Sequence, residues 1–140
     1  MIAIDTNVLL RYLLDDDAKQ SKLAQALIRS HEKVLIVDAV LVETLWTLKG
    51  KKYGLSKDEL IEVVNVLFED RAFLFENNQI VWRALHNYKS AASIEAAKAD
   101  FSDALIVEKA RFVIEKNGQG FEGLFTFDKG ALKLDGAHSP

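Results

Sequence analysis

The chain of 140 residues contains no cysteine, which excludes disulfides, thiolate metal sites and a cysteine nucleophile. Its three histidines, His31, His86 and His138, lack the spacing of metal ligands, so a bound metal would be held by carboxylates. The net charge of −3 gives the surface no overall basic character. A nucleic-acid partner would therefore be recruited by local positive charge or by bound cations.

Long hydrophobic runs are also absent. No apolar run approaches the roughly 18 residues that span a bilayer, and the N-terminus lacks a basic segment followed by an apolar one. We therefore expect a cytoplasmic protein without membrane association. The only proline is Pro140, and no repeat or linker interrupts the chain. Because 49% of the residues are hydrophobic, we expect one well-filled core and a single domain over residues 1–140.

Short apolar segments alternate with longer segments of helical character. The short segments predict strands at residues 1–4, 34–37, 73–75 and 124–127. The longer ones predict helices at residues 6–14, 18–30, 38–53, 57–70, 77–92 and 100–117, with a final turn at residues 129–132. Residues 93–98 either extend the preceding helix or form a loop. This alternation predicts an α/β sandwich, in which helices cover both faces of a parallel sheet.

Several polar residues have the sequence context of helix caps. The acidic run at residues 15–17 precedes a helix, and capping by one of its last two residues is favoured over a functional site. Ser56 and Glu59 fit a capping box. Asp38 is expected to cap the third helix, which Gly54 is expected to end.

Two carboxylates directly follow predicted strands. Asp5 comes after residues 1–4, and Asp128 comes after residues 124–127. Ligands of open parallel sheets bind beyond the carboxyl ends of the strands, so both acids are expected at the same edge. Asp128 alone is more simply explained as the cap of a short helix, whereas Asp5 follows an apolar run in which an unpaired carboxylate would be costly to bury.

Further acids lie at the starts of predicted helices. Glu43 lies off the leucine stripe of its helix, so it is either a solvated first-turn glutamate or a functional residue. Asp100 and Asp103 fit a weak capping box, although Asp103 can equally point into the crevice of Asp5. Acids gathered at one edge would repel one another without a cation, and oxygen ligands suit Mg²⁺ or Mn²⁺. We therefore expect Asp5 to hold a metal ion.

Four short motifs resemble those of the PIN domain family and, within it, the VapC-type toxin ribonucleases of prokaryotic toxin–antitoxin pairs. They are DTN at residues 5–7, VETLW at residues 42–46, ADFSDALIV at residues 99–107 and TFD at residues 126–128. Each motif is short and common, but their order and spacing are specific together. The resemblance covers almost the whole chain. It implies a three-layer sandwich with a central parallel sheet of four to five strands flanked by helices.

The resemblance also implies roles for individual residues. The catalytic, metal-binding quartet would be Asp5, Glu43, Asp103 and Asp128, with Asp100 as an additional acid at the metal and Thr6, Asn7 and Thr126 as polar supports. Spacing leaves open which of Asp100 and Asp103 is the closer ligand. One or two Mg²⁺ or Mn²⁺ ions would activate a water and neutralise charge on the scissile phosphate. The implied activity is metal-dependent endoribonuclease cleavage of RNA.

Basic residues are the expected contacts for the rest of the RNA backbone. The candidates are Arg11, Lys49, Lys51 and Lys52. The three lysines are equally explained as a solvated helix end. Trp46 and Trp82 lie in predicted helices and are expected in the core or in dimer contacts. The resemblance further implies a homodimer and a small inhibitory antitoxin whose tail enters the active-site groove.

Three alternatives stay open. A catalytically silent PIN-like module would bind RNA or protein without cleavage. A Mg²⁺-dependent phosphatase with an aspartyl nucleophile also has Asp at the end of its first strand, but such sites usually have a second acid two residues later, where this chain has Asn7. In a structural domain, the acids would serve only as helix caps.

Overall fold

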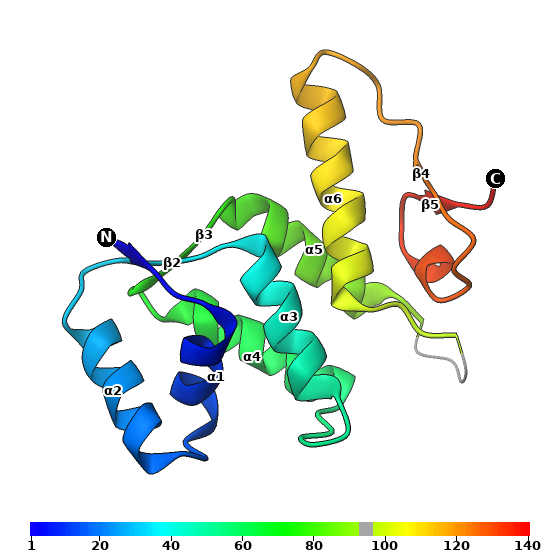
Figure 1. Cartoon of the computed structure of the whole chain (residues 1–140). Coiled ribbons are helices and arrows are strands. Elements are labelled where there is room, and N and C mark those ends of the chain that lie inside the picture. The colour runs from blue at the N-terminus through cyan, green and yellow to red at the C-terminus, as the bar shows by residue number, and fades with distance from the viewer. Residues whose placement is uncertain (93–96) are drawn as a thin grey trace. The chain divides into compact units, whose positions relative to one another are not determined.

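The computed structural model describes residues 1–92 and 97–140. The elements form two compact units, unit 1 (Met1–Glu76) and unit 2 (Asn77–Pro140). In chain order they are β1 (Ile2–Ala3), α1 (Thr6–Leu14), α2 (Ala18–Arg29), β2 (Val34–Ile36), α3 (Asp38–Lys49), α4 (Lys57–Glu69), β3 (Phe73–Phe75), α5 (Asn78–Ser90), α6 (Phe101–Lys116), β4 (Leu124–Phe125), the 3₁₀ turn η1 (Ala131–Lys133) and β5 (Ala137–His138) (Figure 1).

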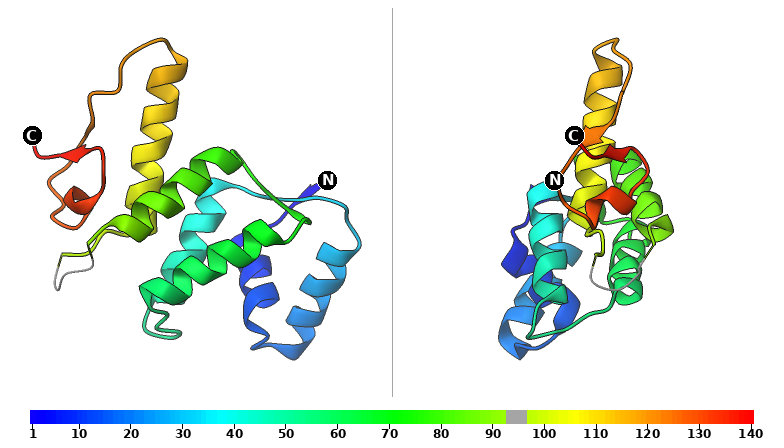
Figure 2. Two further views of the ribbon diagram at one scale, coloured as in Figure 1. Left: turned by 180° about the vertical axis from the view of Figure 1, so that it is seen from behind. Right: turned by 90° about the vertical axis from the view of Figure 1, so that its right-hand side faces the viewer.

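Unit 1 contains a three-stranded parallel sheet in the order β1, β2, β3. The register places Ile2 opposite Val34 and Ala3 opposite Leu35, and Val34 in turn lies opposite Phe73. The central strand β2 is therefore hydrogen-bonded along both edges. Helices connect the strands, and α1 and α2 lie side by side in the views of Figures 1 and 2.

Aliphatic side chains from the sheet and the helices form the core of unit 1. Leu9, Ile36, Leu41, Leu48 and Leu67 are fully buried. Full burial of such a side chain contributes about 1.5–3 kcal/mol. The core therefore fixes α1 and α3 around the carboxyl ends of the strands, where Asp5 and Glu43 occur.

Unit 2 is built on the packing of α5 against α6 (Figure 2). The rings of Tyr88 and Phe101 meet edge to face, with 5.9 Å between their centroids, and Val81 and Val107 are fully buried. Beside these helices, β4 pairs in parallel with β5. The last part of the chain thereby positions the residues that follow β4, including Asp128.

The structure confirms the α/β class and the parallel strand pairing predicted from the sequence. The described strands form a three-stranded and a two-stranded sheet, and β5 has no counterpart among the predicted strands. The predicted cap at Ser56 is confirmed, and Asp17 is the cap of α2 among the two residues that the sequence offered, because both side chains accept hydrogen bonds from backbone N–H groups in the first turns of their helices. Asn77 caps α5 in the same way.

The predicted boundaries of α3 are wrong at both ends. Asp38 is the first helical residue rather than the cap, because Val37 has the extended backbone of the cap position. The helix ends at Gly50 rather than at Gly54, since the Gly50 N–H already bonds to carbonyls of the last turn. Lys51 consequently lies in the turn after the helix and not on a helical face.

Other predictions concern the burial of the tryptophans and the segment between α5 and α6. Trp46 and Trp82 are not core residues, because they are 54% and 49% exposed. The choice between helix and loop for residues 93–98 cannot be made for residues 93–96, which lie outside the described residues. In the described ranges, no helix has both the length and the apolar character needed to cross a membrane. The single domain over residues 1–140 stays a prediction.

Candidate active site

Asp5 lies between β1 and α1 and is exposed. Its Oδ1 accepts a 3.0 Å hydrogen bond from the backbone N–H of Val8, which makes Asp5 the N-cap of α1. Capping accounts for a carboxylate at this strand end and places it at the positive end of the helix dipole. Asp5 therefore presents a carboxylate of fixed orientation at the carboxyl end of β1.

Glu43 is exposed on α3 and reaches the start of α1. The hydroxyl of Thr6 donates a 2.6 Å hydrogen bond to Glu43 Oε2. Because Asp5 immediately precedes Thr6, this bond anchors Glu43 next to the residue that caps α1. The structure thus brings together Asp5, Thr6 and Glu43 from two of the motifs identified in the sequence.

A cavity of about 300 Å³ lies beside Asp5 and is lined by residues of α1 and α2. Asp5, Asn7, Arg11 and Gln20 contribute its polar side chains, whereas Leu23 and Leu27 of α2 contribute apolar surface. Both leucines are exposed. The cavity therefore combines an apolar wall with the candidate metal ligand and with one candidate polar support.

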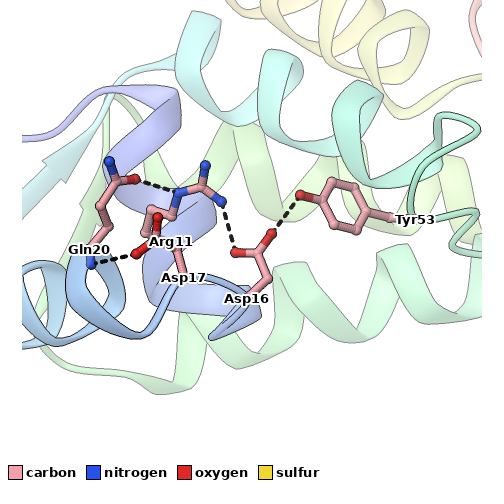
Figure 3. Close-up of polar contacts among 5 residues, drawn as sticks. All are labelled: Arg11, Asp16, Asp17, Gln20 and Tyr53. Atoms are coloured by element: carbon pink, nitrogen blue, oxygen red, sulfur yellow. Dashed lines mark hydrogen bonds and ion pairs between the residues drawn. The ribbon is translucent and has the colours of Figure 1, made fainter.

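Arg11 is held in a polar network at the junction of α1 and α2 (Figure 3). Its Nε donates to Gln20 Oε1 at 2.7 Å, and its Nη1 donates to Asp16 Oδ1 at 2.8 Å. Tyr53, which follows α3, donates its hydroxyl proton to Asp16 Oδ2 at 2.9 Å. Asp17 Oδ1 accepts from the Gln20 N–H at 3.0 Å as the cap of α2.

This network changes the ionisation of its charged members. The hydrogen bonds from Tyr53 and then Arg11 lower the pKa of the Asp16 carboxyl below its usual value, and the bond to Asp16 raises the pKa of Arg11. Arg11 would have to give up these partners to contact a phosphate. Tyr53 and Gln20 are contacts that the sequence did not reveal, because no local pattern relates Tyr53 to a residue 37 positions earlier.

Lys49, Lys51 and Lys52 lie at the end of α3 and in the turn after it, and all three are exposed. The Nζ of Lys52 lies 5.1 Å from the centroid of the Tyr53 ring. This position suits a phosphate contact and also suits the negative end of the helix dipole. The two explanations given by the sequence both fit the geometry.

Asp100 and Asp103 lie at the start of α6 and are both partly buried. Asp103 Oδ2 accepts a 2.9 Å hydrogen bond from the backbone N–H of Asp100. This is the backward contact of the capping box that the sequence predicts. Their roles as metal ligands, and their order of distance from a metal, stay predictions.

Asp128 is exposed and follows β4. Its Oδ1 accepts a 2.9 Å hydrogen bond from the N–H of Ala131, the first residue of η1, although the cap position of that turn is occupied by Gly130. Thr126 Oγ1 accepts a 3.0 Å bond from the Asp128 N–H, and the Thr126 N–H donates to the carbonyl of His138 at 2.9 Å. Thr126 therefore fixes the backbone that carries Asp128.

The carboxylate and carbonyl oxygens of these motifs are suitable ligands for Mg²⁺ or Mn²⁺. Asp5 and Glu43 belong to unit 1, and Asp103 and Asp128 belong to unit 2, so a site shared by all four stays a prediction. Within each unit, the described residues include no group of three or more His, Asp or Glu side chains that could hold a metal ion. The pair in unit 1 fits a hydrated Mg²⁺, which commonly uses one or two carboxylates and keeps several waters.

Comparison with known families gives a match over nearly the whole chain. The PIN domain model matches residues 2–137, a range that contains every acid considered above. The comparison with curated proteins found no match.

Proposed function

Because this chain belongs to the PIN domain family, we propose that it is a metal-dependent endoribonuclease and the toxin of a VapC-type toxin–antitoxin pair. PIN domains are generally nucleases that bind nucleic acid and typically use divalent metal ions. The proposal adds that the substrate is RNA and that the nuclease is the toxic member of a pair.

The hydrogen bond between Thr6 and Glu43 is the observation that carries the proposal. It holds a second carboxylate beside the strand end at which Asp5 caps α1. Two exposed carboxylates in one place repel each other, and a divalent cation removes that repulsion.

The proposed metal ligands are Asp5, Glu43, Asp103 and Asp128, with Asp100 as an additional acid. Mg²⁺ or Mn²⁺, when bound, supplies a water of lowered pKa and neutralises charge on the phosphate. The chain itself orients the ligands. Backbone N–H groups of Val8, Asp100 and Ala131 bind Asp5, Asp103 and Asp128, respectively, while the hydroxyl of Thr6 binds Glu43.

The proposed phosphate contacts are Lys49, Lys51 and Lys52, which are exposed beyond the α3 residues that carry Glu43. Arg11 would have to give up its hydrogen bonds to Asp16 and Gln20 before it could contact a phosphate. Each lysine that contacts a phosphate releases counterions, so RNA binding should weaken as the salt concentration rises.

A toxin of this type would have a small antitoxin as partner, and we propose that its tail occupies the cavity beside Asp5. The exposed Leu23 and Leu27 support this placement, because they offer an apolar wall next to a carboxylate that attracts basic side chains. We also propose a cytoplasmic location, since the proposed substrate is cellular RNA. The resemblance to VapC-type toxins further supports the proposal of a homodimer.

The test is an RNA cleavage assay with purified, partner-free protein. Structured and single-stranded RNAs are incubated with Mg²⁺ or Mn²⁺, with EDTA as the metal-free control. Asp5→Asn removes a proposed ligand, and Asp15→Asn is a matched control. Asp15→Asn removes the same charge at the other end of α1. Asp15 is exposed and has a left-handed backbone conformation, which asparagine also tolerates.

Metal-dependent cleavage that is lost in Asp5→Asn and kept in Asp15→Asn is the expected result. Equal cleavage by both variants would remove Asp5 from the proposed site. Metal binding without cleavage of any RNA would instead favour the silent binding module, and hydrolysis of small phosphate esters would favour the phosphatase.

A further inference from the structure

Unit 2 contains a groove whose lining does not include Asp100, Asp103 or Asp128. Its volume is about 450 Å³, within the usual range of ligand sites of about 300–1,000 Å³. The lining residues are Trp82, Arg83, His86, Asn87 and Ser90 of α5, Glu108 and Arg111 of α6, and Asp135 before β5.

The inner wall of this groove is a polar network. Asn87 Nδ2 donates to Glu108 Oε1 at 3.2 Å and to the carbonyl of Asp135 at 2.9 Å, and Asn87 Oδ1 accepts from the Asp135 N–H at 2.9 Å. Glu108 is only 8% exposed and forms an ion pair of 3.4 Å with Arg111. These bonds hold α5, α6 and the segment before β5 in one arrangement, so the groove is preformed.

The outer edge of the groove carries an aromatic side chain. Trp82 is 49% exposed, and its ring centroid lies 4.2 Å from that of His86. The Nδ1 of His86 lies 2.9 Å from the Trp82 carbonyl oxygen, so Nδ1–H is the donor of this hydrogen bond. His86 therefore holds the indole of Trp82 in place while leaving half of its surface to solvent.

Positive charge accompanies this aromatic side chain. Helix α5 contains Arg83 and Lys89 and has no Asp or Glu, although the whole chain has a net charge of −3. Arg83 and Lys89 are exposed. An indole beside cations is the combination with which proteins bind single-stranded nucleic acid, since bases stack on the ring and phosphates pair with the cations.

We propose that this groove binds one nucleotide of single-stranded RNA outside the cleavage site, with an unpaired base stacked on Trp82 and a phosphate paired with Arg83. The inference rests on the proposed function, because the nucleotide would belong to the RNA that is cleaved. A second copy of the chain is the less suitable occupant. In a symmetric dimer the same surface would meet itself and bring like charges of two α5 helices together.

Tryptophan fluorescence tests the proposal directly, because Trp46 and Trp82 are the only tryptophans. Trp46→Phe leaves Trp82 as the reporter, and Trp82→Phe leaves Trp46. Each full-length variant is titrated with short oligouridylate or oligoadenylate in EDTA, so that no cleavage occurs. Saturable quenching of Trp82 is the expected result, and its absence while RNA binds elsewhere would overturn the proposal.

Binding measured by fluorescence anisotropy of labelled RNA gives a second readout. Trp82→Ala should weaken binding about five- to tenfold, the lower part of the range for a stacked base. Arg83→Gln should reduce the salt dependence by about one phosphate contact, whereas Arg83→Lys should keep it. Circular dichroism of each variant confirms that the protein is folded, and unchanged affinity in folded Trp82→Ala would contradict the stacking contact.

The two proposals can fail separately. Quenching of Trp82 without cleavage of any RNA would support this groove and reject the nuclease. Cleavage that depends on Asp5 without any response of Trp82 would support the nuclease and reject this groove. A Trp82 signal that changes with protein concentration but not with RNA would also reject it and would assign the surface to a second copy of the chain.

Discussion

Thr6 Oγ1 donates a 2.6 Å hydrogen bond to Glu43 Oε2 and so joins the first residue of α1 to the middle of α3. The two residues are 37 positions apart, and the bond holds Glu43 beside the cap formed by Asp5. One helix start therefore positions two of the four acids proposed for catalysis. This arrangement makes the hydroxyl of Thr6 a positioning group whose contribution can be measured.

Replacement of Thr6 by valine should lower RNA cleavage about ten- to a hundredfold, because valine has the same shape but no hydroxyl to hold Glu43 in place. Thr6→Ser keeps the hydroxyl and should retain most of the activity. Cleavage rates at saturating RNA provide the measurement. Equal rates for the serine and valine variants would show that the bond does not position a catalytic group.

Metal binding should stabilise the protein. A ligand at one hundred times its Kd adds about 2.7 kcal/mol to the free energy of unfolding. We expect Mg²⁺ or Mn²⁺ to raise the Tm of the wild type and of Asp15→Asn, EDTA to reverse the rise, and Asp5→Asn to show a smaller one. Thermal unfolding followed by circular dichroism tests this, and an identical rise in Asp5→Asn would place the metal elsewhere.

The pKa of Asp16 should depend on Tyr53. The lowered pKa of Asp16 means that its ionised form stabilises the folded state above the usual carboxyl value of 3.8. This stabilisation is lost as the pH falls below 3.8 and through the lowered pKa. Tyr53→Phe removes the largest cause of the shift, so the pKa should rise.

Titration of the Asp16 carboxyl carbon by NMR measures this effect. Tyr12→Phe is a matched control, because the Tyr12 hydroxyl donates to Asp70 instead, at 3.1 Å. The control should leave the pKa of Asp16 unchanged. An Asp16 pKa that is the same in the wild type and in Tyr53→Phe would exclude the hydrogen bond as its cause.

Ser21 of α2 is fully buried, and its Oγ has no hydrogen-bond partner among the described residues. A buried hydroxyl without a partner is costly, and alanine has a higher helix propensity than serine. Ser21→Ala should therefore increase the free energy of unfolding by about 1 kcal/mol. Urea denaturation gives the midpoint. A lower midpoint would mean that the hydroxyl has a partner in solution, such as a bound water.

Asn87 should be important for the stability of unit 2. Asn87→Ala removes three hydrogen bonds and leaves the buried Glu108 carboxylate with one partner fewer. We expect a loss of about 1–3 kcal/mol, the usual result of leaving a buried polar group unsatisfied. Ser90→Ala, on the exposed side of the same helix, is the control and should have little effect. Comparable urea midpoints for the two variants would contradict the network.

The sequence predicted best those elements whose signals are local. The caps at Asp17 and Ser56 depend on contacts within three residues, which the sequence displays directly. The same holds for the capping contact of Asp103 with Asp100. Strand β5 was missed because its two residues are too few to show alternation, and only pairing with β4 defines it.

Contacts between distant segments explain the other differences. Val37 rather than Asp38 is the cap residue of α3. The Asp38 N–H, in the first turn of this helix, donates a 2.6 Å hydrogen bond to the Glu76 carboxylate. A partner 38 residues away cannot be found from helix periodicity. The bond of Thr6 to Glu43 has the same character. Helix periodicity indicated Glu43 as a possible functional residue, but only the resemblance of the DTN motif to the PIN domain family indicated Thr6.

The strand order of unit 1 also has a consequence for protein synthesis. The strands β1, β2 and β3 pair in the order in which they are translated. Each new strand therefore extends an edge that already exists, and none has to be inserted between two earlier strands. The sheet of unit 1 can therefore grow in one direction on the ribosome. Nascent chains stalled at increasing lengths should then gain protection from protease in steps, after β2 and again after β3.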